Sequence, residues 1–356
     1  MWSNLPIDLL LNIFSHLPPD SLARARAACR SWRATSELAV SRNCHPPWFV
    51  ALPARGWGLS CYAHNPVKDS WHVLDLDRTT TPMRPIAAIG GLILLKLGSA
   101  ARLQLAICNP FTNQFRALPA LRVARTNPAV GVVEDDGDRG FKIYVAGGMS
   151  ESAGGGAVYE ASVEVYDSSC SGGGWGVVGA MPVELAVRLT VWTPNESVWS
   201  GDGVLYWMTS ARAYSVMGFD MSSKTWREVG VPMADRLEFA ALVRREGRLA
   251  VVGGTCGGGG RVWELGGGGD GWGVVGEVPA ELGIRLLGEK LNWGCVKCVG
   301  VDGTICLYKD IGSGIIIWSQ GKWSWIHGCY SIDGTKIMSF PIKGILLQPN
   351  LARTTF

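Results

Sequence analysis

The sequence predicts a mainly β protein, in which a six-bladed β-propeller is preceded by a small domain of three helices. Two patterns support this prediction: residues 2–38 have helical periodicity, and from about Trp48 onward an aromatic anchor recurs at intervals of 44 to 60 residues. Glycine contributes 47 of the 356 residues and charged side chains only 18%, which favours strands and turns. We expect the helical domain at 1–42, a linker at 43–47 and the propeller at 48–356.

Residues 2–38 contain the signals for two helix starts. Ser3 and Asn4 can cap a helix that has Pro6 in its first turn, and Pro18-Pro19-Asp20-Ser21 ends that helix and starts another. A domain of about forty residues cannot bury a broad apolar stripe within itself, so we expect a second surface to cover it. The stripe consists of Leu5, Leu9, Leu10, Ile13, Phe14 and Leu17.

The order of motifs in this stretch resembles that of the F-box. The matching residues are Leu5-Pro6, Asp8-Leu9-Leu10, Ile13-Phe14, Leu17-Pro18, Leu22, Cys29-Arg30 and Trp32-Arg33. The resemblance implies three helices that dock on a Skp-family adaptor and, through it, on the cullin of a ubiquitin ligase. It implies that the adaptor-facing residues are Leu5, Pro6, Ile13, Leu17, Leu22 and Trp32. A three-helix cap packed on its own domain would explain the stripe, but not the order of the motifs.

Six aromatic anchors define the repeat of the second domain, and their period of about 50 residues is that of propeller blades. Paired glycines follow two predicted strands, at Gly147-Gly148 and Gly253-Gly254, and we expect them where the backbone is crowded near the axis. Together with Tyr166-Asp167, this order of motifs resembles kelch repeats. The first unit is short of strands, so the C-terminal stretch 336–348 is predicted to complete its blade and close the ring. The anchors are Trp71, Phe115, Trp175, Trp226, Trp272 and Trp323.

Composition excludes several classes of partner. The formal net charge is +3 and the basic residues are scattered, so no surface for nucleic acid or an anionic membrane is predicted. The longest apolar stretch, 85–95, is far shorter than a membrane span, and the N-terminus does not resemble a secretory signal. We expect a protein of the cytoplasm, the nucleus or both. Ten dispersed cysteines are expected to be free and buried, and the pair Cys295 and Cys298 to be structural.

No cofactor, metal site or catalytic residue is predicted. Enzymes that resemble galactose oxidase use the same fold, but their copper chemistry needs converging His and Tyr ligands, and this chain has five His. No nucleophile elbow, zinc-binding helix or phosphate loop is present in the sequence.

Arginines recur after the proline turn that ends several units, which places them at one face of the predicted ring. One interpretation is that each arginine fastens the loop between blades. The other is that they form a recruitment surface for an acidic or phosphorylated segment of a target, because guanidinium groups bind carboxylate and phosphate in a bidentate manner. The candidate target-binding residues are Arg84, Arg125, Arg188, Arg236 and Arg285.

The two resemblances together imply an F-box/kelch-repeat protein of the kind abundant in plants. They imply the substrate-receptor subunit of an SCF ubiquitin ligase, whose F-box docks the Skp adaptor while its propeller recruits an unidentified target protein for degradation. Two alternatives stay open: a scaffold that binds the adaptor without delivering a target, and a propeller enzyme with an appended docking domain.

Overall fold

The structure is a computed structural model that describes eleven ranges of the chain. They are residues 5–38, 45–54, 60–76, 82–98, 102–134, 140–152, 154–170, 173–191, 197–266, 271–330 and 341–351. The predicted domain boundary stays a prediction, because most of the stretch between the third helix and the first strand lies outside these ranges.

Three short helices open the chain, as the sequence predicts. They are α1 (Ile7–His16), α2 (Pro19–Ala28) and α3 (Arg30–Leu38). Pro6 precedes α1, and Pro19 occupies the first position of α2, where its missing N–H removes no helical hydrogen bond.

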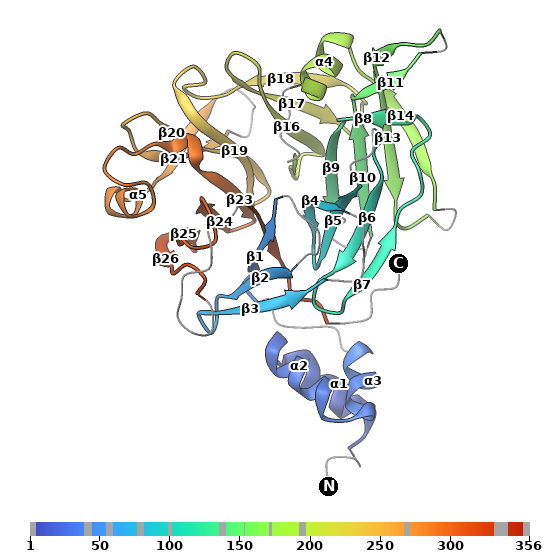
Figure 1. Ribbon diagram of the computed structural model, residues 1–356, viewed down its shortest axis with the longest axis vertical. Helices are drawn as coiled ribbons and strands as arrows, with labels where there is room; N and C mark the ends of the chain where they lie inside the picture. The colour runs from blue at the N-terminus through green and yellow to red at the C-terminus, as the bar shows by residue number, and fades with distance from the viewer. Residues whose placement is uncertain are drawn as a thin grey trace.

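Six four-stranded antiparallel sheets follow, which confirms the predicted six blades (Figure 1). From the innermost strand outward, blade 1 contains β27 (Ile342–Leu347), β1 (Trp48–Pro53), β2 (Ser60–Asn65) and β3 (Ser70–Asp75). Blade 2 contains β4 (Met83–Ile89), β5 (Leu92–Leu97), β6 (Leu105–Asn109) and β7 (Gln114–Ala117). Blade 3 contains β9 (Ala129–Glu134), β10 (Phe141–Ala146), β13 (Ser162–Asp167) and β14 (Trp175–Ala180).

The other three blades follow the same order. Blade 4 contains β15 (Ser197–Trp199), β16 (Val204–Ser210), β17 (Tyr214–Asp220) and β18 (Trp226–Gly230). Blade 5 contains β19 (Leu237–Arg245), β20 (Arg248–Thr255), β21 (Gly260–Leu265) and β22 (Trp272–Glu277). Blade 6 contains β23 (Lys297–Val301), β24 (Thr304–Tyr308), β25 (Ile315–Ser319) and β26 (Lys322–Ile326).

The two ends of the propeller sequence close the ring within blade 1. Strand β27 pairs with β1 in an antiparallel register that runs from Trp48 opposite Leu347 to Pro53 opposite Ile342. This pairing confirms that the C-terminal stretch supplies the missing strand, although residues 336–340 of the predicted stretch lie outside the described ranges. Closure in this way leaves no free edge between the first and last blades.

Each predicted anchor lies on the outermost strand of a different blade. Trp71 is on β3, Phe115 on β7 and Trp175 on β14, and the remaining three lie on β18, β22 and β26. The repeat is therefore a true structural period, with one anchor per blade.

Six separate apolar clusters form the core, and each lies between two neighbouring blades. Leu94 of blade 2 packs with Ile143 of blade 3, for example, and Tyr308 of blade 6 packs with Phe49 of blade 1. Because the sixth interface joins the last blade to the first, burial holds the ring together around its whole circumference.

The paired glycines do not lie beside the axis, which corrects the sequence-based expectation. They end or follow the second strand of their blades, where a connecting segment packs on them. A Cβ on Gly148 would lie 2.7 Å from the carbonyl oxygen of Thr126, and one on Gly254 would lie 2.3 Å from the Trp293 ring. Close approach of these connections therefore requires the glycines.

Connections between blades, and one connection within blade 3, contain elements that were not predicted from the sequence. Helix α4 (Val183–Val191) leads into blade 4, and α5 (Ala280–Leu287) and the 3-10 turn η2 (Trp293–Cys295) lead into blade 6. A three-stranded sheet of β8 (Arg125–Thr126), β11 (Met149–Glu151) and β12 (Ala157–Tyr159) extends from blade 3.

The propeller has two distinct faces because its strands alternate in direction. The turns after the first and third strands of each blade lie on one face, which we call the F-box face, because the helical domain contacts it. The remaining connections, with α4, α5 and the β11–β12 hairpin, lie on the opposite connection face. Figure 1 shows the three helices below β3 and β7.

The C-terminal segment fastens the helices to the F-box face. Leu351 is 8% exposed and packs in one cluster with Leu10, Phe14, Leu22 and Ala25. The Arg26 guanidinium donates a hydrogen bond to the Leu351 carbonyl oxygen, and Asn109 Nδ2 donates to the Asn350 carbonyl oxygen at 2.9 Å. An ion pair between Lys68 and Asp20 adds a second contact between propeller and helices.

Candidate functional site

Helix α1 divides its apolar residues between two faces. Leu10 and Phe14 point into the small core of the helical domain, where Phe14 meets the Trp32 ring edge-on at 5.5 Å between centroids. Ile7, Leu9 and Ile13 point outward and are 54%, 51% and 42% exposed. The propeller therefore leaves uncovered the face of α1 that carries Leu9 and Ile13, while Ile7 is exposed on another side of the first turn. Three exposed large aliphatic side chains so close together are unusual.

The predicted adaptor-facing residues occupy different environments. Pro6 and Ile13 are exposed, and Leu5, Leu17 and Trp32 are half-buried. Leu22 is buried in the cluster that contains Leu351. Their role in adaptor binding stays a prediction, and the accessible part of the set is centred on Ile13.

Sequence reasoning did not include Ile7 and Leu9 in the adaptor-facing set. The signal was present, because Leu9 and Ile13 are four residues apart and so share a helix face, whereas Leu10 and Phe14 share the neighbouring face. The wide apolar stripe is thus two stripes, one buried in the helical domain and one exposed.

Among the predicted target-binding arginines, Arg125 is not available to a partner, which corrects that expectation. Its side chain has no exposed surface, and its Nη2 lies 2.5 Å from Oε1 of the equally buried Glu164. The guanidinium also donates to the carbonyl oxygens of Gly147 at 3.1 Å and Ser162 at 3.0 Å. Glu164 also accepts hydrogen bonds from the backbone N–H groups of Arg122 and Val123. The Arg125–Glu164 ion pair therefore fastens the loop between blades 2 and 3.

The other four arginines lie on the connection face, and they differ in their exposure and in the groups they contact. Arg188 on α4 forms a bidentate pair with Glu228 at 2.9 Å for both contacts, and this hydrogen bond holds the pKa of the Glu228 carboxyl below its usual value. Arg285 on α5 is exposed and stacks over the Trp325 ring at 4.2 Å. Arg84 and Arg236 are exposed at the starts of blades 2 and 5. The structure thus brings the four to one face without joining them into a cluster.

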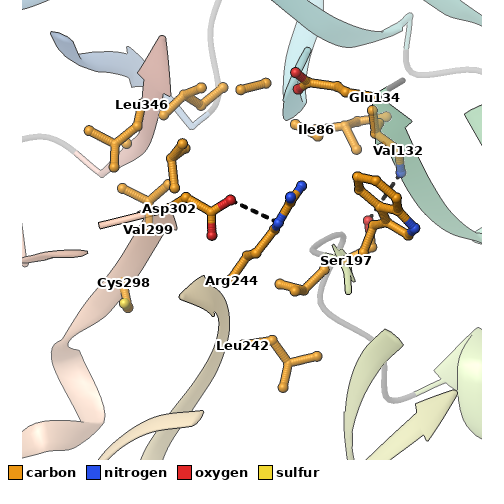
Figure 2. Close-up of a pocket in the computed structure, with 18 of the residues that line it drawn as sticks. Ile86, Val132, Glu134, Ser197, Leu242, Arg244, Cys298, Val299, Asp302 and Leu346 are labelled. Atoms are coloured by element: carbon orange, nitrogen blue, oxygen red, sulfur yellow. Dashed lines mark hydrogen bonds and ion pairs between the residues drawn. The ribbon is translucent and has the colours of Figure 1, made fainter. Parts of the chain in front are cut away.

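A cavity of about 330 Å³ occupies the central channel and is lined by the innermost strand of every blade (Figure 2). Apolar side chains form most of its wall, and Arg244 of β19 extends into it. Sequence reasoning missed this residue, although a charged side chain two residues after Leu242 on one strand was a visible signal.

The described part of the chain shows no arrangement suited to metal chemistry. No group of three or more His, Cys, Asp or Glu residues within it is placed to hold a metal ion. Its nine described cysteines are all free, but only five are buried, so the expectation of buried thiols holds for about half of them. Cys298 is buried and Cys295 exposed. None of the helices in the described ranges has the length and apolar character needed to cross a membrane.

Comparisons with known proteins agree with this organisation. A family profile described as F-box-like matches residues 2–38. F-box only protein 6 of Arabidopsis thaliana is 24% identical over 94% of this chain and 72% of that protein. Protein ABERRANT PANICLE ORGANIZATION 1 of Oryza sativa subsp. japonica is 28% identical over 71% of this chain, and the match spans 61% of its own length.

Two further comparisons concern the propeller. An F-box/kelch-repeat protein of Arabidopsis thaliana is 24% identical over 93% of this chain and 83% of that protein. Among solved structures, that of YjhT is similar with a TM-score of 0.43 and 14% identity, over 67% of this chain and 81% of that chain. The chain therefore has an F-box-like domain at its N-terminus followed by a six-bladed propeller, and its relatives are plant F-box proteins that include F-box/kelch-repeat proteins.

Proposed function

We propose that this protein is the substrate-receptor subunit of an SCF ubiquitin ligase. F-box domains bind Skp1-type adaptors in such complexes, and the observation that carries the proposal is the uncovered apolar face of α1 formed by Leu9 and Ile13, with Ile7 exposed one turn earlier. Burying each of these side chains against an adaptor would contribute about 1.5–3 kcal/mol, enough for a stable complex after the costs of association.

The target protein would bind on the connection face. This face is directed away from the helices, so a bound target and a bound adaptor would not compete for space. Arg84, Arg236 and Arg285 are exposed there and suit an acidic or phosphorylated segment of the target. Arg188 is a weaker candidate, because Glu228 already pairs with both of its Nη atoms.

In this mechanism the chain binds and does not itself react. The adaptor and cullin would bring the charged conjugating enzyme close to the target, and the raised effective concentration of target lysines would accelerate ubiquitin transfer. The proposed site of action is the cytoplasm, the nucleus or both.

Proteins captured in proteasome-inhibited cells test the proposal. The bait is the full chain, compared with an Ile13→Asp variant that retains the propeller but has a charge on the proposed adaptor face. We expect targets to be captured by both baits, and to rise in abundance in cells that contain only the variant. Stable partners whose abundance is the same in both cells would contradict delivery of targets and favour the scaffold alternative.

Charge reversal locates the target surface. The triple variant Arg84→Glu, Arg236→Glu, Arg285→Glu is expected to lose the captured targets while it still binds the adaptor. Arg248→Glu is the matched control, because Arg248 is also exposed but lies at the turn between β19 and β20 on the F-box face. Retention of targets by a folded triple variant would leave these arginines with a structural role only.

A further inference from the structure

The central channel contains a cavity whose size and lining suit a small molecule. Its volume of about 330 Å³ is at the lower end of the range for small-molecule sites, ~300–1,000 Å³. Each blade contributes to the wall, and the apolar part of the lining includes Ala88, Val132, Trp199, Leu242, Val299 and Ile345. A cavity of this size is too small for a folded element or an extended peptide.

Arg244 places a positive charge inside this cavity and is held there from two sides. Its Nε lies 2.9 Å from Oδ2 of Asp302, and its guanidinium carbon lies 4.6 Å from the centre of the Trp199 ring. Figure 2 shows the side chain extending from its strand into the middle of the cavity, toward Ile86 and beside Asp302. Only 25% of its surface is exposed. The guanidinium is therefore preorganised, and a ligand would not have to order it.

The two carboxylates in the lining have structural duties. Asp302 accepts the backbone N–H of Gly247 through Oδ1 at 3.2 Å, in addition to the pair with Arg244. Glu134 accepts the backbone N–H of Gly90 through Oε1 at 2.8 Å. Each carboxylate thus fastens a turn of the preceding blade. The cationic side chains of the lining are Arg244 and Lys343, and Arg244 extends into the middle of the cavity.

We propose that the central channel binds a small organic acid, with its carboxylate at Arg244 and its apolar body against the walls of the inner strands. A guanidinium forms charge-assisted hydrogen bonds with a carboxylate, and their geometry matches. A neutral apolar molecule is disfavoured, because it would remove water from the guanidinium without replacing its hydrogen bonds. This site does not depend on the proposed ligase function, since it uses neither the α1 face nor the connection face.

Fluorine NMR on the full chain tests the site with defined probes. The probes are 4-fluorophenylacetate and 4-fluorobenzoate, and each is paired with its neutral amide, 4-fluorophenylacetamide or 4-fluorobenzamide. We expect the wild-type protein to broaden the carboxylate signals and to bind each amide at least tenfold more weakly.

Two variants connect the signal to the cavity. Arg244→Gln is expected to weaken carboxylate binding at least tenfold, whereas Arg248→Gln is not, because Arg248 is an exposed arginine outside the channel that also pairs with a glutamate. Val132→Phe leaves Arg244 in place and fills the cavity, so it is expected to abolish binding even if the Arg244 variant fails to fold. No broadening of either carboxylate by wild type, equal binding of acid and amide, or undiminished binding by Val132→Phe would overturn the proposal.

Discussion

The buried ion pair of Arg125 and Glu164 leads to an unusual prediction: a second substitution should restore part of the stability that the first one removes. Replacing Arg125 by Met removes five hydrogen-bonding contacts and leaves the Glu164 carboxylate buried with only the N–H groups of Arg122 and Val123. Removing one partner of a buried ion pair costs about 3–5 kcal/mol, because the other charge stays uncompensated. We expect Arg125→Met to lower the free energy of unfolding by that amount.

A second substitution separates charge from packing. Glu164→Gln removes the negative charge and keeps an acceptor for one of the two backbone N–H groups, which bond to different oxygens of the carboxylate. In the wild-type background it should destabilise the protein, because Arg125 loses its counter-charge. In the Arg125→Met background it should stabilise the protein, because it neutralises the orphaned carboxylate.

Urea denaturation of the full-length variants, followed by tryptophan fluorescence, measures these differences. The reasoning predicts that the double variant is more stable than Arg125→Met alone, so the two effects are strongly non-additive. A cost below about 1 kcal/mol for Arg125→Met, or simple additivity of the two substitutions, would refute the buried-pair account.

Three further predictions concern other parts of the molecule. Leu351→Asp places a carboxylate among the apolar residues of the helical domain, so hydrogen exchange should accelerate in α1 and α2 but not in the blades. Burial lowers the pKa of both His64 and His72, so the unfolded chain takes up protons below about pH 6.5 that the folded chain resists. The urea midpoint should therefore fall between pH 7.5 and 5.5, and this fall should shrink in the His64→Gln, His72→Gln variant. Iodoacetamide at pH 8 should label exposed Cys295 and spare buried Cys298, whereas protection of both by a bound metal would contradict the structural interpretation.

Much of the propeller follows from local sequence signals. The anchors mark the outermost strands because a large aromatic ring recurs wherever a strand closes a blade, and the shortage of strands in the first unit predicted the role of the C-terminal strand. The connection elements could not be predicted in the same way. Helices α4 and α5 are only nine and eight residues long, too short for a clear helical period beside apolar strands.

The candidate sites, like the fold, were only partly predictable from the sequence. The order of motifs in residues 2–38 identified the F-box-like domain, but not which of its apolar residues are buried. Leu10, Phe14 and Leu22 pack in one cluster with Leu351, more than 300 residues away in the sequence. The proline-to-arginine spacing located residues on one face correctly. It could not show that Arg125 is buried in an ion pair with Glu164, because this contact depends on pairing between strands that are far apart in the sequence.

Binding of the full-length protein to a purified Skp1-type adaptor tests the central claim most directly. Ile13→Asp on α1 is compared with Val274→Asp on β22, because both replace an exposed aliphatic residue, 42% and 54% exposed, by the same charge. We expect the wild type and Val274→Asp to bind equally and Ile13→Asp to bind roughly 10- to 100-fold more weakly, as follows from the loss of about 1.5–3 kcal/mol of apolar burial. Absence of binding by the wild type, or equal weakening by both substitutions, would contradict the assignment of the α1 face to an adaptor.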